Sequence, residues 1–315
     1  MSLIKNLKQI YAYNMGFRKG DSILIVTDPD LDNIGDLFFR AGLSLGAETM
    51  LLKMKTRNEN GEEPPVIIAN AMINSDIVMM PTSKSLSHTS ARRSASSSGA
   101  RIASMPGITM PILKRMLEVD YEKLKSLTKK IGSRLKTSTS LRILTEIGTD
   151  ITMDIKKREV HEDIGLLSKK GRFGNLPAGE ADLSPREGTA EGQIYFDGSA
   201  LRKKLEEPIK VTVKNGIAVK FEGSKTAKEL EKTLRSVGKK AFNIAEIGIG
   251  TNKFAKLTGN ILEDEKVYGT CHIAFGNNKS YGGKVDVPIH LDCVIKKPDI
   301  YLDNKIIMKK GKLKI

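Results

Sequence analysis

The hydrophobic pattern of this chain changes near residue 138, and the two parts restrict the fold in different ways. Before that point, strand-like runs alternate with segments of helical periodicity, with strands expected at 22–27, 48–54, 76–80 and 101–105. Such alternation is typical of βαβ units wound into a parallel sheet. Residues 1–137 are therefore predicted to form an α/β, Rossmann-like domain. It contains neither a GxGxxG motif nor a Walker loop, so nothing specific supports a nucleotide site.

The second part has the pattern of an antiparallel β structure. A helix predicted at 121–135 precedes a break rich in serine and threonine, and hairpin patterns dominate afterwards. Among them, Asn215-Gly216 separates two β-branched runs, which is typical of a tight hairpin. Residues 138–315 are therefore predicted to form a mainly antiparallel, β-rich domain. Its one predicted helix begins at a capping box formed by Thr226 and Glu229.

Length and composition restrict the classes of function. With 315 residues and 39% hydrophobic content, the chain is long enough for two globular domains. No run approaches the roughly 20 apolar residues of a membrane span and the start does not resemble a signal peptide, so a cytoplasmic protein without a membrane partner is expected. The two cysteines, Cys271 and Cys293, are expected to be small buried side chains.

The strong positive charge raises the question of nucleic acid as a partner. The net charge of +15 comes from short basic pairs spread along the chain with carboxylates between them. No zinc-finger or aromatic RNP motif accompanies them. A solvated basic surface is therefore expected, and nucleic acid is not the expected partner.

The candidate chemistry lies in the C-terminal part. Two of the four histidines, His272 and His290, fall in one short window, and Asp292 follows the second. Because side chains alternate along a strand, His290 and Asp292 face the same way. Glu246 ends another apolar run, where a carboxylate is costly unless it is paired. Imidazole and carboxylate groups on one face can share a cation, so a metal site is predicted here.

Five segments stand out together when they are taken in chain order. They are NLPAGE at 175–180, AEIGIG at 245–250, LEDEK at 262–266, HIAFG at 272–276 and HLD at 290–292. In this order they resemble the aminopeptidase T family of metallo-aminopeptidases. The resemblance covers the second half of the chain and reaches into the first half at 87–93 and 99–107.

The resemblance implies two divalent ions, zinc, cobalt or manganese, which hold a hydroxide between them. It implies an aminopeptidase that removes N-terminal residues from short peptides, as a homodimer. Glu265 and Tyr281 would act at the reacting bond, with Tyr281 placed to stabilise the tetrahedral oxyanion. His161, in a charged connector, and His88, at a helix start, are left outside this site. The implied metal ligands are Glu180, Glu246, Glu265, His272, His290 and Asp292.

Two alternatives are compatible with the same sequence. The motifs also resemble 2,5-dihydroxypyridine dioxygenase, a ring-cleaving enzyme of similar fold with a single iron. In that interpretation His272, His290 and Asp292 form a facial triad of two histidines and one carboxylate. The second alternative is a non-catalytic, basic scaffold that binds nucleic acid. The spacing of the residues does not separate these cases.

Overall fold

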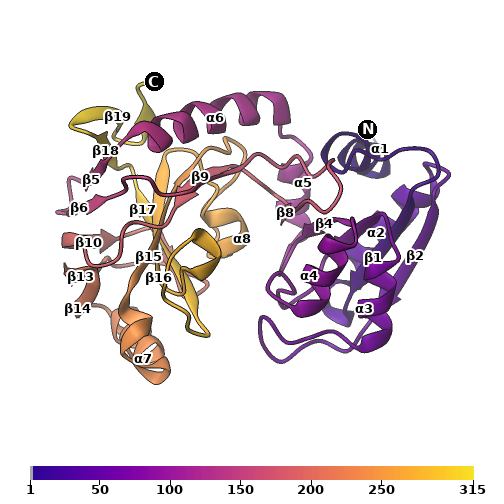
Figure 1. Cartoon of the computed structure of the whole chain (residues 1–315), viewed down its shortest axis with the longest axis horizontal. Helices are drawn as coiled ribbons and strands as arrows, with labels where there is room; N and C mark the ends of the chain where they lie inside the picture. Colours follow the sequence, from indigo (N-terminus) through magenta and orange to yellow (C-terminus); the bar gives the residue numbers. More distant parts are fainter. Residues whose placement is uncertain (1–2) are drawn as a thin grey trace. The chain divides into compact units, whose positions relative to one another are not determined.

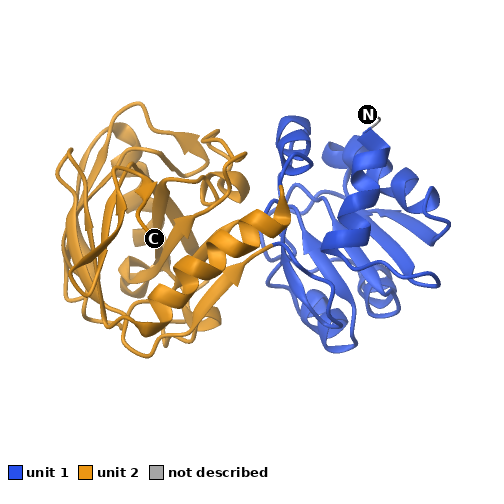
Figure 2. Cartoon of the chain, turned by 90° about the horizontal axis from the view of Figure 1, so that it is seen from above, with its two compact units in different colours: residues 1–119, 165–178 blue, residues 120–164, 179–315 orange. Residues whose placement is uncertain are grey.

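The fold combines a parallel α/β part with a mainly antiparallel β part, as predicted (Figure 1). The computed structural model describes residues 3–315. These form two compact units (Figure 2): unit 1 comprises the residues up to Val119 and Gly165–Ala178, and unit 2 comprises Asp120–Ile164 and Gly179–Ile315. No helix in the described part of the chain is long and apolar enough to cross a membrane.

Unit 1 is built on a sheet of five parallel strands in the order β2-β1-β3-β4-β8. These are β1 (Ser22–Thr27), β2 (Glu48–Lys53), β3 (Ile77–Met80), β4 (Arg101–Ser104) and β8 (Phe173–Asn175). Strands β3 and β4 are buried along their whole length, as is typical of the inner strands of a parallel sheet. Helix α1 packs against α2, and α3 against α4. The helices are α1 (Leu3–Gln9), α2 (Asp32–Leu43), α3 (Val66–Ile73), α4 (Ser90–Ser97) and α5 (Met110–Met116).

Unit 2 contains two large antiparallel sheets, besides the short antiparallel pair of β11 (Ser199–Ala200) and β12 (Lys203–Lys204). The larger has the order β14-β13-β10-β6-β5-β18-β19-β20, with β5 (Ser140–Leu144), β6 (Asp150–Asp154), β10 (Glu191–Phe196), β13 (Ile209–Lys214), β14 (Ile217–Gly223), β18 (Asp299–Leu302), β19 (Lys305–Lys309) and β20 (Lys312–Leu313). The smaller has the order β17-β16-β15-β9-β7, with β7 (Val160–Asp163), β9 (Glu180–Leu183), β15 (Ile244–Gly250), β16 (Thr270–Gly276) and β17 (His290–Lys296). Its helices are α6 (Tyr121–Thr137), α7 (Lys225–Val237) and α8 (Ile261–Asp264).

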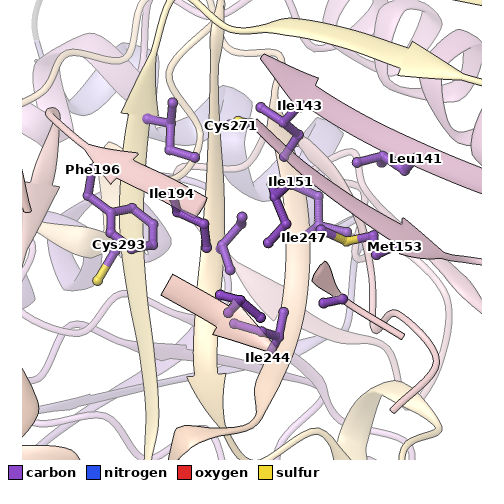
Figure 3. Packing of buried hydrophobic residues seen from close by; sticks show 14 of the residues in the cluster. Leu141, Ile143, Ile151, Met153, Ile194, Phe196, Ile244, Ile247, Cys271 and Cys293 are labelled. Carbon is purple, nitrogen blue, oxygen red and sulfur yellow. The ribbon is translucent and has the colours of Figure 1, made fainter. Parts of the chain in front are cut away.

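One hydrophobic core joins the two sheets of unit 2 (Figure 3). Phe196 of β10 and Phe275 of β16 meet there edge to face, with ring centroids 5.8 Å apart. Cys271 and Cys293 are buried, free thiols in the same core, which confirms their expected place. The predicted hairpin is also confirmed: β13 and β14 pair around Asn215 and Gly216, both at positive φ.

The units divide the chain differently from the predicted ranges 1–137 and 138–315. Helix α6 packs on β7 and β9 and therefore belongs to unit 2, so the first boundary lies before Asp120. The segment Gly165–Ala178 returns to unit 1, where β8 pairs with β4. The predicted capping box is absent from α7, because Ser224 is the N-cap residue and Glu229 pairs with Lys203 at 2.9 Å.

Candidate metal centre

The candidate residues lie on the face of the smaller sheet that points away from the core. Cys271 and Cys293 point into the core, so the neighbouring His272 on β16 and Asp292 on β17 point to the other face. Glu246 on β15 lies next to a core isoleucine and follows the same rule. Strand alternation therefore separates core-forming from chemically active side chains, as the sequence predicted.

The first group of ligand atoms comes from Glu246, His290 and Asp292, which lie within 4.8 Å of one another. His290 Nε2 is 2.9 Å from Glu246 Oε2 and 3.4 Å from Asp292 Oδ1. On the other side of the ring, His290 Nδ1 donates a hydrogen bond of 2.8 Å to the Asn277 carbonyl. This bond fixes the ring so that Nε2 faces the carboxylates, as is common for a histidine that binds metal.

The second group comes from Glu180, Glu265 and His272, again within 4.8 Å of one another. His272 Nε2 is 3.6 Å from Glu180 Oε2 and 3.3 Å from Glu246 Oε1. Glu246 thus contacts one histidine of each group, and its carboxylate joins the two groups. All six ligands named from the sequence therefore lie in one cluster.

The pairing register places small residues beside the candidate ligands. Gly248 of β15 is the partner of His272, and Ala274 of β16 is the partner of both Glu246 and Asp292. Gly276 is likewise the partner of His290. Because these positions carry little or no side chain, the sheet leaves space above itself for the imidazoles and carboxylates.

The carboxylates strongly favour protonated histidines. Burial lowers the pKa of His272, but the hydrogen bond that His272 donates to Glu246, together with the neighbouring carboxylates, outweighs burial and raises that pKa to about 10. The same competition, with Asp292 and Glu246, raises the pKa of His290 well above its ordinary value. Burial raises the pKa of Glu246, but both histidines outweigh it and hold that pKa below its ordinary value. A bound divalent cation would displace the two imidazolium protons.

Lys266 is a part of this cluster that sequence reasoning missed. Its side chain is 2% exposed, and Nζ pairs with Glu180 Oε1, with Glu265 Oε1 at 2.8 Å and with Asp163 Oδ2 at 3.5 Å. In the sequence it ends an acidic run that suggests a solvated face, whereas Glu263 and the residues beside it are largely buried. Lysine is almost never fully buried unless it is paired, and here three carboxylates pair with Lys266.

His161, which was placed outside the site, lies inside the same unit beside it. Its Nδ1 is 3.2 Å from Asp182 Oδ1, and the hydrogen bond to this carboxylate raises the pKa of His161. Tyr281 contacts two imidazoles: its ring is 5.2 Å from that of His161 and stacks on that of His290 at 5.4 Å. His161 and Asp163 are two positions apart on β7, as His290 and Asp292 are on β17. This spacing places both side chains of each pair on one face of a strand, and it is the sequence signal that could have identified His161. His88 lies in unit 1, before α4.

The donor set fits a divalent metal ion. Among residues 3–315, the buried Glu180 Oε2 and His272 Nδ1 have no hydrogen-bond partner. A mixture of imidazole nitrogen and carboxylate oxygen suits iron, manganese, cobalt or zinc. The three residues of the facial-triad alternative are divided between the two groups, with His272 in one and His290 and Asp292 in the other. Glu246 is the residue that connects them.

Comparison with known proteins decides the family. A family model described as NicX, 2,5-dihydroxypyridine 5,6-dioxygenase, matches residues 9–315. The chain belongs to the NicX family. A curated relative, the 2,5-dihydroxypyridine 5,6-dioxygenase of Pseudomonas putida KT2440, is 26% identical in an alignment of 214 residues that covers 64% of this chain and 61% of the relative. The matched region thus spans less than two thirds of that relative.

Solved structures extend the likeness of this NicX family member to the whole fold. The structure of 2,5-dihydroxypyridine dioxygenase from P. putida KT2440 aligns with a TM-score of 0.83 and 20% identity, covering 99% of this chain and 96% of that one. The structure of AmpT from Thermus thermophilus aligns with a TM-score of 0.73 and 14% identity, covering 99% of both chains. At these identities, both comparisons show a shared fold.

The prediction of an aminopeptidase is wrong. The family model and the curated relative both name a dioxygenase, which is an oxidoreductase, and neither names a hydrolase or a protease. The aminopeptidase T resemblance is correct for the fold. The error has a chemical reason, because imidazoles and carboxylates serve both hydrolytic and oxidative metal centres. The roles of Glu265 and Tyr281 in peptide hydrolysis are therefore withdrawn.

Proposed function

We propose that this protein is an iron-dependent, ring-cleaving dioxygenase that acts on 2,5-dihydroxypyridine or a closely related dihydroxylated N-heteroaromatic compound. Two findings support the proposal: the NicX family model matches residues 9–315, and unit 2 gathers imidazoles and carboxylates in one cluster. The observation that carries it is the contact of both His272 and His290 with Glu246. The homodimer, and the lack of a nucleic-acid partner, stay predictions.

The iron ligands that we propose are His272, His290 and Asp292, with Glu246 beside both imidazoles. When bound, ferrous iron supplies the redox chemistry and the open coordination positions that non-haem oxygenases use. The chain itself orients His290 through the Asn277 carbonyl and excludes water from His272, which is fully buried.

The residues around Tyr281 are candidates for accepting the hydroxyl protons that the substrate loses. Dihydroxylated substrates lose hydroxyl protons when their rings are oxidised, so an acceptor is needed near the metal. His161 is held by Asp182 and lies against Tyr281, whose ring also stacks on that of His290. We propose that His161 is this acceptor and that Tyr281 holds the imidazoles in place.

The test is oxygen uptake. Protein loaded anaerobically with Fe(II) should consume about one dioxygen per molecule of 2,5-dihydroxypyridine, with loss of the aromatic absorbance and with both atoms of ¹⁸O₂ in the product. H290A and H272A should lose this activity, whereas E231Q, on the surface of α7, should keep it. The proposal fails if iron-loaded protein consumes no oxygen with 2,5-dihydroxypyridine or other dihydroxylated pyridines.

A further inference from the structure

The second group of ligand atoms already contains a positive charge. The ammonium of Lys266 pairs with Glu180 and lies 2.8 Å from Glu265, two of the three members of that group. Asp163 adds a third carboxylate at 3.5 Å. The first group, around His290, includes no such contact with a lysine or arginine among the ion pairs of residues 3–315.

We propose that Lys266 replaces a second metal ion: by pairing with Glu180 and Glu265, its ammonium restricts the centre to one divalent ion. This inference rests on the proposed function, from which it takes the single iron, and it adds the reason why only one ion binds. It assigns to one residue the difference between a one-metal and a two-metal centre on the same set of carboxylates and histidines.

The backbone holds Lys266 in this position. Its amide donates to the Glu263 carbonyl at 3.0 Å, and its own carbonyl accepts from the Asn252 amide at 2.8 Å. The segment that follows lies directly on β15, because a Cβ at Gly250 would be 2.1 Å from the Val267 carbonyl oxygen. Gly250 is also the register partner of Glu180, so the glycine brings the lysine backbone close to the carboxylate that the ammonium binds.

The ammonium leaves too few free ligands for a second ion. One oxygen of Glu180 and one of Glu265 are engaged by Lys266, so the second group offers chiefly Glu180 Oε2 and the imidazole of His272. A divalent ion placed there would also lie beside the buried ammonium, where like charges repel strongly because the surroundings are of low dielectric. Removal of the ammonium frees both carboxylates and leaves them without a counter-charge.

The experiment counts metal ions in metal-stripped protein titrated with Mn(II). The unaltered chain should bind one ion by calorimetry and elemental analysis and give the EPR spectrum of isolated Mn(II). K266M, which keeps the length of the side chain and removes its charge, should bind two ions with an exchange-coupled spectrum. K203M removes an exposed lysine that pairs with Glu229 and is the matched control, with one ion.

The proposal is overturned by two ions in the unaltered chain, or by one ion in folded K266M. K266M leaves buried carboxylates unpaired. If it does not fold without metal, Mn(II) should restore folding and raise its unfolding temperature more than that of the unaltered chain. Failure of Mn(II) to do so also overturns the proposal. These readouts need no turnover, so an absence of oxygen uptake would count against the proposed function and not against the role of Lys266.

Discussion

Gly248 lies directly against the imidazole of His272. A Cβ at position 248 would be 2.1 Å from Cε1 and 2.3 Å from Nε2 of that ring, both far closer than non-bonded atoms approach. The two residues are register partners on β15 and β16. The missing side chain of Gly248 therefore allows the imidazole to reach Glu246 and Glu180.

The G248A variant tests this relationship. The added methyl group must push the ring of His272 away from the carboxylates, so we expect Mn(II) affinity to fall about 10- to 100-fold. Overpacking should also lower the free energy of unfolding by about 1–3 kcal/mol. Calorimetric titration and denaturant unfolding measure the two effects. In an H272A background, G248A should cause no further loss of affinity; an additive loss would show that the glycine does not act through the histidine.

Glu246 should control the protonation of both histidines. In E246Q the shared carboxylate becomes a neutral amide, so the pKa of His272 should fall from about 10 toward its ordinary range. The affinity for a divalent ion should fall more than about tenfold, because the residue that joins both ligand groups loses its charge. Histidine NMR titration and calorimetry measure these changes. E231Q, which only breaks a surface pair with Arg235, is the control and should behave like the unaltered chain.

Metal binding should release protons and strengthen as the pH rises. His272 keeps its proton up to a pKa of about 10, so at neutral pH an incoming cation must displace it. Calorimetry of Mn(II) binding in buffers of different ionisation enthalpy should therefore give different apparent enthalpies at pH 7. Equal enthalpies in all buffers would mean that the ring is already neutral.

The same raised pKa predicts how stability depends on pH in the protein without added metal. Because the folded-state pKa lies above that of the unfolded chain, the stabilisation by protonated His272 is fully present below about pH 6.5. It is lost as the pH rises through about 10. The free energy of unfolding, followed by denaturant titration, should show this decline more weakly in H272Q.

Tyr281 should act mainly through its ring. Y281F keeps the stacking on His290 at 5.4 Å and should bind Mn(II) within about twofold of the unaltered chain. Y281A removes the contact with both His290 and His161, so the imidazoles lose their support and affinity should fall about tenfold. If Y281F binds metal as weakly as Y281A, the phenol oxygen, and not the stacking, is what matters.

The fold was predictable from the sequence where the local hydrophobic pattern agrees with the pairing of the strands. The apolar runs around His272 and His290 become adjacent strands, and alternation correctly sends Cys271 and Cys293 to the core. The path of Gly165–Ala178 back to unit 1 was not predictable, because three residues of β8 pair with a strand that lies far away in the sequence. No local periodicity marks so short a parallel strand.

The sequence predicted which residues gather in the candidate site, and it did not predict what surrounds them. Motif order identified Glu180 and Glu265, which have no distinctive local pattern of their own, whereas Glu246 was also marked by its place at the end of an apolar run. Lys266 and His161 were missed because a charged run and a charged connector usually face solvent, whereas here tertiary packing buries the lysine and brings the histidine to Asp182. The reaction was not predictable, since the same donor atoms suit more than one chemistry.

The return of the chain to complete the first sheet has a consequence for biosynthesis. Strand β8 belongs to unit 1, yet it follows α6 and three strands of unit 2 along the chain. As the polypeptide leaves the ribosome, the parallel sheet cannot gain its fifth strand until residue 175 has emerged, when β5, β6 and β7 already await partners that are still to be made. Unit 1 can therefore be completed only after part of unit 2 has been made, and no single cut of the chain separates the two units with both of them whole.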